Sequence, residues 1–150
     1  MYHPAISDTP DLLTEWRWLL GGRACLLGWS ASGDLFYADE RGAAWRLDAG
    51  GGEAERAAAS RTALEAALAE PASAAELLLL PVVAAYEAAH GTLGHGSCLG
   101  YTILPVFGGA YTADNRYALP VAEYAAFTGD VHRQIRDLPE RDRLELRVMP

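Results

Sequence analysis

Short apolar and aromatic runs, separated by turns that contain glycine and aspartate, fill residues 24–57 and predict a β-meander. Such short connections favour hairpins, so neighbouring strands are expected to pair antiparallel. The triple glycine at 50–52 forms the last of the turns. Three strong strands and a weaker fourth are expected at 24–30, 35–38, 44–47 and 54–57.

Residues 8–20 carry leucines and a tryptophan at helical spacing, which predicts an N-terminal helix. Asp8 or Thr9 is expected to cap its first turn, because both side chains accept hydrogen bonds from free helix amides. Gly21 and the glycine after it are expected to end it.

Residues 60–91 are predicted to be helical, in segments that prolines delimit. Pro71 separates the first segment from the next, and Pro81 kinks or restarts the second because proline lacks the amide that a helix interior needs. Gly91 is expected as the C-cap. Capping boxes are expected at two places, Thr62 with Glu65 and Ser73 with Glu76.

The C-terminal part alternates strands and loops before a last helix that opens at Pro120. Its apolar stripe is expected to hold Tyr124, Phe127, Val131 and Ile135. Strands are expected at 98–104, with Tyr101 and Ile103 on one face, and at 116–119, with a long loop over 105–113 between them.

Residues 143–148 alternate strictly between apolar and charged side chains. This pattern predicts a half-buried strand that either closes the sheet or pairs with another chain. A homodimer through the 143–148 strand is therefore one expected assembly.

Length and composition favour a single domain over residues 1–150, with a core that needs no disulfide or metal. The N-terminus shows no secretory signal, and no apolar run approaches the length of a membrane span. We therefore expect a cytoplasmic protein without a membrane partner.

The net charge of −8 argues against direct binding to nucleic acid, which requires a clustered basic surface. An acidic surface is compatible with docking onto a basic protein, although acidic side chains also serve solubility.

The sequence predicts no catalytic, cofactor-binding or metal-binding residue. Cys25 and Cys98 lie in apolar, strand-like stretches and are expected to be buried free thiols. His90 and His95 lie near Cys98, but their spacing fits no zinc signature. His132 is expected at the edge of the apolar stripe rather than as a general base.

The loop after the 98–104 strand combines aromatic residues with a glycine pair. Glycine pairs suit tight backbone geometry, and Asp or Asn side chains fix turns by bonding nearby amides. An aromatic loop of this kind also suits recognition of a partner, and the two interpretations remain open. The candidate partner-binding residues are Phe107, Gly108, Gly109, Tyr111, Asp114 and Asn115.

This segment resembles the C-terminal domain of Tdi-type immunity proteins of type VI secretion systems, over roughly residues 24–138. The resemblance extends to the SUKH superfamily of Smi/Knr-like proteins. It rests on Gly100-Tyr101, Pro105, Gly108-Gly109, Asn115 and His132, and on the strand sequences Gly33-Asp34-Leu35-Phe36 and Trp45-Arg46-Leu47-Asp48.

The resemblance implies a non-enzymatic immunity protein that neutralises a cognate, nuclease-type toxin, which we expect to be basic. It also implies a SUKH-like α+β fold, which agrees with the patterns above: a curved, mainly antiparallel sheet, an N-terminal helix, and helices packed on one face. The first alternative is a ligand-binding or enzymatic domain with a site near Tyr101, Tyr111 and His132. The second is a homo-oligomeric structural module.

Overall fold

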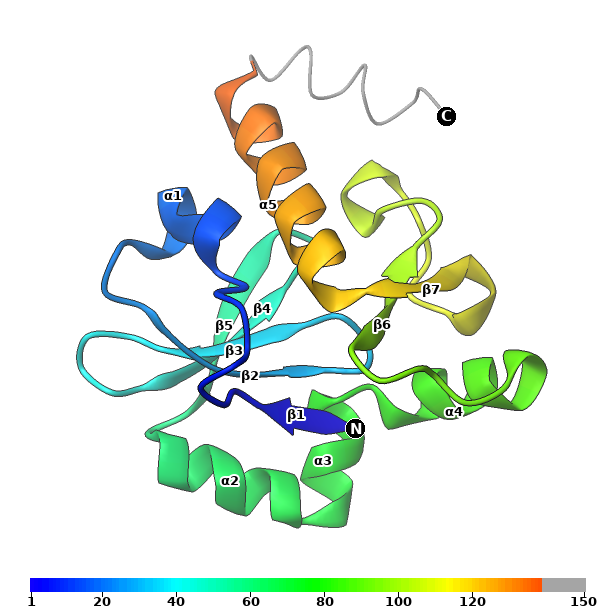
Figure 1. Cartoon of the computed structure of the whole chain (residues 1–150), viewed down its shortest axis with the longest axis horizontal. Coiled ribbons are helices and arrows are strands. Elements are labelled where there is room, and N and C mark those ends of the chain that lie inside the picture. The colour runs from blue at the N-terminus through cyan, green and yellow to red at the C-terminus, as the bar shows by residue number, and fades with distance from the viewer. Residues whose placement is uncertain (139–150) are drawn as a thin grey trace.

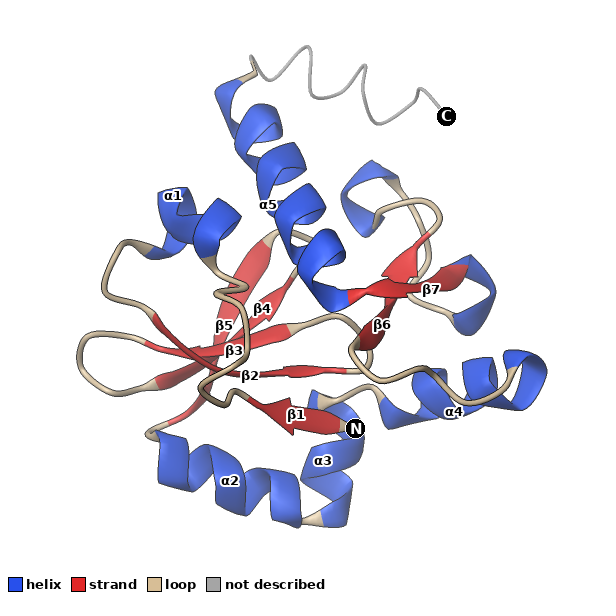
Figure 2. Cartoon of the chain, in the orientation of Figure 1, coloured by secondary structure: helices blue, strands red, loops and turns tan. Residues whose placement is uncertain are grey.

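A five-stranded antiparallel sheet forms the centre of the fold in a computed structural model of the chain, which describes residues 1–138 (Figures 1 and 2). Its strands follow one another in sequence order: β1 (Tyr2–Pro4), β2 (Cys25–Ser30), β3 (Leu35–Ala38), β4 (Ala44–Asp48) and β5 (Glu53–Ala58). The predicted meander is thus confirmed. The sheet also gains β1, which is too short to show a pattern in the sequence.

A second, two-stranded antiparallel sheet pairs β6 (Ser97–Tyr101) with β7 (Arg116–Pro120). The helices are α1 (Arg17–Leu20), α2 (Arg61–Ala69), α3 (Pro71–Leu77), α4 (Leu80–His90) and α5 (Val121–Asp137). Three 3₁₀ turns complete the described elements: η1 (Thr14–Trp16), η2 (Pro105–Phe107) and η3 (Ala113–Asn115). The α+β class predicted from the sequence is confirmed.

Alternation along β3 divides the core into two layers. Phe36 belongs to a cluster with Leu64 of α2 and Ala74 of α3. Leu35 and Tyr37 belong to the cluster formed with residues of η1, β6 and α5. Since successive strand residues point to opposite faces, α2 and α3 cover one face as expected, while α5 covers the other (Figure 1).

The N-terminal helix is much shorter than the predicted 8–20, because residues 8–13 form turns. Asp11, rather than Asp8 or Thr9, organises this stretch: its carboxylate accepts the Leu13 amide and the Arg17 guanidinium. Only η1 and the single turn of α1 are helical, and Gly21 ends them as expected.

The helices after β5 begin earlier than the predicted capping boxes. The side chain of Ser60 accepts the Ala63 amide at the start of α2, and that of Glu70 accepts the Ser73 amide at the start of α3. The boundaries that Pro71, Pro81 and Gly91 predict are confirmed.

The buried stripe of α5 is displaced from the predicted one. Tyr124 is buried, but Phe127 is 54% exposed, and Thr128 and His132 face the core instead. Hydrogen bonds from two tryptophan indoles orient this face toward the core. Trp16 Nε1 donates to the Ala125 carbonyl, and Trp18 Nε1 donates to the Gly129 carbonyl.

Three further expectations differ from the structure or lie outside it. The first strand of the second sheet ends at Tyr101, so Ile103 is exposed in the following loop rather than sharing the face of Tyr101. Cys25 is exposed, whereas Cys98 is buried as predicted. The predicted strand at 143–148 lies outside the described residues.

Within residues 1–138, no single helix has both the length and the apolar composition to cross a membrane, and only α3 and α4 together, bent by 72°, pass that test.

The close approach of α5 to η1 yields a first prediction. A Cβ on Gly129 would lie 2.7 Å from the carbonyl oxygen of Glu15. Alanine normally stabilises a helix by about 1 kcal/mol relative to glycine. Here we expect Gly129→Ala to lower the free energy of unfolding by about 1–3 kcal/mol, measured by chemical denaturation, because backbone must move. A variant more stable than the wild type would contradict this packing.

Candidate functional site

The loop between β6 and β7 is closed by one side chain, that of Asn115. Its Nδ2 donates to the carbonyls of Ile103 at 2.8 Å and Ala110 at 2.7 Å, and its Oδ1 accepts the Ile103 amide at 3.0 Å. These bonds replace the strand ladder that ends at Tyr101. The two ends of the loop are therefore tied together at the surface by the Asn115 side chain.

The glycine pair of the loop also allows the loop to close tightly. Gly108 follows η2 with a φ of 92°, in the left-handed region that favours glycine. At Gly109, the Ile103 carbonyl occupies the place where a Cβ would stand. Asp114 is exposed and accepts a bond from the Thr112 hydroxyl. Gly108, Gly109 and Asn115 thus support the loop, which presents the exposed side chains of Ile103 and Tyr111 and the half-buried ring of Phe107.

Tyr111 joins this loop to the turn between β4 and β5. Its hydroxyl donates to Asp48 Oδ2 at 2.9 Å, and Asp48 Oδ1 accepts the amides of Gly50 and Gly51 at 3.1 Å each. Two segments far apart in sequence therefore form one surface.

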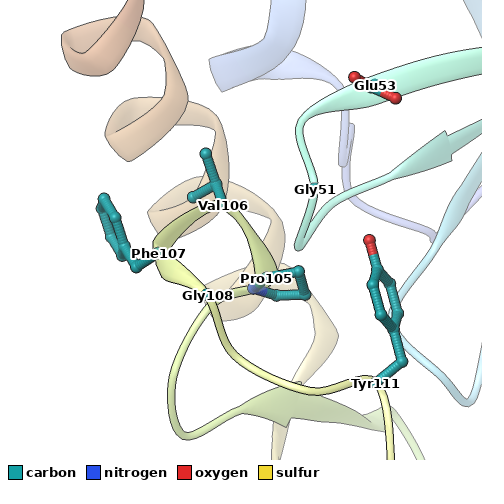
Figure 3. Close-up of a pocket in the computed structure, with 7 residues that line it drawn as sticks. All are labelled: Gly51, Glu53, Pro105, Val106, Phe107, Gly108 and Tyr111. Carbon is teal, nitrogen blue, oxygen red and sulfur yellow. The ribbon is translucent and has the colours of Figure 1, made fainter. Parts of the chain in front are cut away.

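A cavity of about 410 Å³ opens between the loop and the turn (Figure 3). Tyr111, which is 46% exposed, points its hydroxyl end toward the turn, and Glu53 stands at the start of β5. The lining residues are Gly51, Glu53, Pro105, Val106, Phe107, Gly108 and Tyr111. Of the predicted partner-binding residues, three thus line one cavity.

A buried arginine supports the surface from below. The Arg116 guanidinium donates to the carbonyls of Ser32 at 2.9 Å and Leu99 at 3.2 Å, and lies 3.7 Å from the centre of the Tyr101 ring. It also donates to the Tyr111 carbonyl. Arg116 is only 5% exposed, so its charge is used inside the protein.

Asp34 is buried close to this arginine. Burial, and then the negative charge of Asp48, raise the pKa of Asp34 to about 7, while Arg46, Arg116 and a hydrogen bond from the Ala49 amide act in the opposite direction. The carboxyl is thus poised to change its protonation state near neutral pH.

His132 is a buried structural residue, rather than the boundary residue predicted. Its Nε2 lies 3.0 Å from the Ala49 carbonyl, and its ring fills the space beside Gly52, whose φ is +77°. Burial lowers the pKa of His132, so the imidazole favours its neutral form. Its carbonyl partner fixes the ring against the β4–β5 turn.

Tyr101, Tyr111 and His132 do surround one feature, the Gly50–Gly52 turn. Tyr101 and His132 are covered by that turn, and only Tyr111 reaches the cavity. Burial, followed by the charge of Asp34, raises the pKa of the nearby Cys98 thiol to about 12, so it is protonated at neutral pH. Among residues 1–138, no group of three metal-binding side chains comes together.

Sequence reasoning missed the acidic side of this surface. Asp48 anchors Tyr111, and Glu53 lines the cavity, yet neither was among the candidates. The triple glycine at 50–52 could have pointed to this turn as part of the site, because a turn without side chains lets large rings pack against it.

A larger, mainly apolar cavity of about 540 Å³ lies elsewhere, beside β1 and the start of α5. His3, Ile6 and Trp29 are among the residues that line it. It contains none of the predicted partner-binding residues.

The loop closure yields a second prediction. Asn115→Asp removes both donors and sets a carboxylate against two carbonyls, so we expect a loss of about 2 kcal/mol in the free energy of unfolding. Hydrogen exchange at the Ile103 amide should also accelerate. The neighbouring Asp114→Asn is the matched control, with an expected loss below about 1 kcal/mol. Equal losses in the two variants would contradict the role of Asn115.

Asp34 yields a third prediction. Because its folded pKa is raised from 3.8 to about 7, the folded protein binds this proton more tightly than the unfolded chain. The resulting stabilisation is complete below the unfolded pKa and is lost as the pH rises through the folded pKa. Between about pH 8 and about pH 5, the stability of wild type relative to Asp34→Asn should therefore rise by about 2.5 kcal/mol.

This difference is measured by denaturant unfolding of both proteins at each pH. His132, whose pKa is lowered, has the opposite pH dependence, but it is present in both proteins and cancels. Parallel stability curves would show that Asp34 does not titrate in this range.

One family model matches the sequence, and none of the curated proteins does. The match is described as T6SS immunity protein Tdi1, C-terminal, and spans residues 58–132, which is half of the chain. It runs from the end of β5 through His132 and includes the whole β6–β7 loop, but not β2, β3 or β4. The chain therefore belongs to the family of the C-terminal domain of the type VI secretion immunity protein Tdi1.

Proposed function

We propose that this chain binds and neutralises a nuclease-type toxin in the cytoplasm, and that it does so without catalysis. The observation that carries the proposal is the rigid β6–β7 loop, whose Asn115 and glycine pair hold Phe107 and Tyr111 at the surface beside a cavity. A preformed aromatic surface binds with little loss of conformational freedom.

The charge of the chain supports a basic partner. With a net charge of −8, the protein attracts a cationic protein at long range and repels nucleic acid. A nuclease carries basic residues where it holds its substrate. An acidic immunity protein would therefore compete for the surface that the toxin uses on nucleic acid.

The chemistry of the site favours binding over catalysis. The buried Cys98 thiol, with its raised pKa, is a poor nucleophile, and the imidazole of His132 is engaged with a backbone carbonyl. The enzymatic alternative near Tyr101, Tyr111 and His132 therefore has less support. We further propose that residues 1–150 work as one domain of SUKH-like architecture.

A fourth prediction tests the function in living cells. Co-expression of the full chain with its cognate toxin should restore growth of a bacterial host that the toxin alone stops. Tyr111→Ala should weaken toxin binding by about 2 kcal/mol, or roughly 30-fold in Kd, because it removes an exposed aromatic contact. The matched control is Tyr117→Ala, since Tyr117 of β7 is exposed to a similar extent, 44% against 46%.

Thermal unfolding of both variants separates loss of binding from loss of folding. Binding should also weaken as salt is added, because charge attraction is screened. Unrescued growth together with no measurable binding of the wild-type chain would overturn the proposed function.

A further inference from the structure

The cavity beside the β4–β5 turn holds one carboxylate that is not used within the fold. Among the described residues, the side chain of Glu53 accepts no hydrogen bond and forms no ion pair, although it lies at the cavity wall. Its neighbour on the same strand, Glu55, is paired with Arg46 at 2.9 Å. Asp48 is likewise saturated by the Tyr111 hydroxyl and by two amides.

Acidic side chains surround the Tyr111 side of this cavity. Burial, and then the charges of Asp48, Asp34 and Glu53, raise the pKa of Tyr111 to about 12. The nearest buried cation, Arg116, is held beneath the loop by carbonyls and by the ring of Tyr101. Its guanidinium does not line the cavity, which therefore has a carboxylate without a positive partner.

The walls of the cavity combine flat side chains with polar groups, in about equal parts of polar and apolar surface. Tyr111 forms one side and Pro105 and Phe107 belong to the η2 side, as Figure 3 shows. Flat aromatic surfaces beside a carboxylate suit a guanidinium, which stacks on rings and binds carboxylates through two parallel hydrogen bonds. A volume of about 410 Å³ is within the range of small-ligand sites.

We infer that this cavity receives an arginine side chain of the partner, with Glu53 accepting its guanidinium and Tyr111 supporting its plane. The inference rests on the proposed function, since it names the chemistry by which the basic toxin is recognised. Because Glu53 is exposed, one such pair contributes modestly, at most about fivefold in Kd. It supplies specificity for the side chain more than it supplies total affinity.

The experiment that tests this inference needs no toxin. The full chain, labelled with ¹⁵N, is titrated at low salt with the peptide acetyl-Gly-Arg-Gly-amide and with its citrulline analogue, which has a similar shape and no charge. The arginine peptide should shift the amides of Gly51, Glu53 and Tyr111 and saturate with a Kd in the millimolar range, whereas the citrulline peptide should not.

Two variants with the same change of charge make the test specific. Glu53→Gln should weaken binding of the arginine peptide about fivefold. Glu76→Gln is the matched control, because Glu76 is an exposed residue of α3, on the opposite side of the sheet, and it should leave the peptide Kd unchanged.

Equal shifts with arginine and citrulline, or equal affinities for wild type and Glu53→Gln, would overturn the inference. Neither result would contradict the proposed function, which is tested by toxin binding and growth rescue with the wild-type chain. Conversely, binding of the arginine peptide by a chain that neutralises no toxin would overturn the function and leave the cavity's preference for arginine intact.

Discussion

The turn between β4 and β5 is the feature on which the remainder of this structure depends. The peptide at Ala49 donates its N–H to the Asp34 carboxylate and meets His132 of α5 at its carbonyl. The carboxylate of Asp48 closes the same turn and accepts the Tyr111 hydroxyl. One turn therefore holds together the central sheet, the last helix and the loop of the second sheet. Glycines make this possible, because a Cβ would collide with the Tyr101 ring at Gly50, with the Asp48 carboxylate at Gly51 and with the His132 ring at Gly52.

This arrangement requires two charged side chains, Arg116 and Asp34, to lose most of their contact with water. Arg116 and Asp34 are almost fully enclosed, and neither is left without partners: the arginine bonds carbonyls and the aspartate accepts an amide. Opposite charges nearby reduce the cost, but desolvation still dominates at Asp34, as its raised pKa indicates. The gain is a loop fixed from below, since Arg116 also bonds the Tyr111 carbonyl.

The hydrogen bonds that close the β6–β7 loop determine which of its side chains lie at the surface. Asn115 and the glycine pair are occupied in closing the loop and present little to a partner. Phe107, Tyr111 and Glu53 line the cavity, and these are the side chains that we propose for recognition.

The sequence by itself determined the antiparallel meander, the helix breaks at Pro71 and Pro81, and the loop that follows β6. These features are local, because turns, proline and strand alternation act over a few residues. Only the tertiary structure decided which face of α5 is buried, since the indoles of Trp16 and Trp18 choose carbonyls more than 100 residues away. It also decided that His132 is buried and that Glu53 joins the cavity. The physical reason is that burial and charge depend on neighbours in space, which spacing along the chain does not specify.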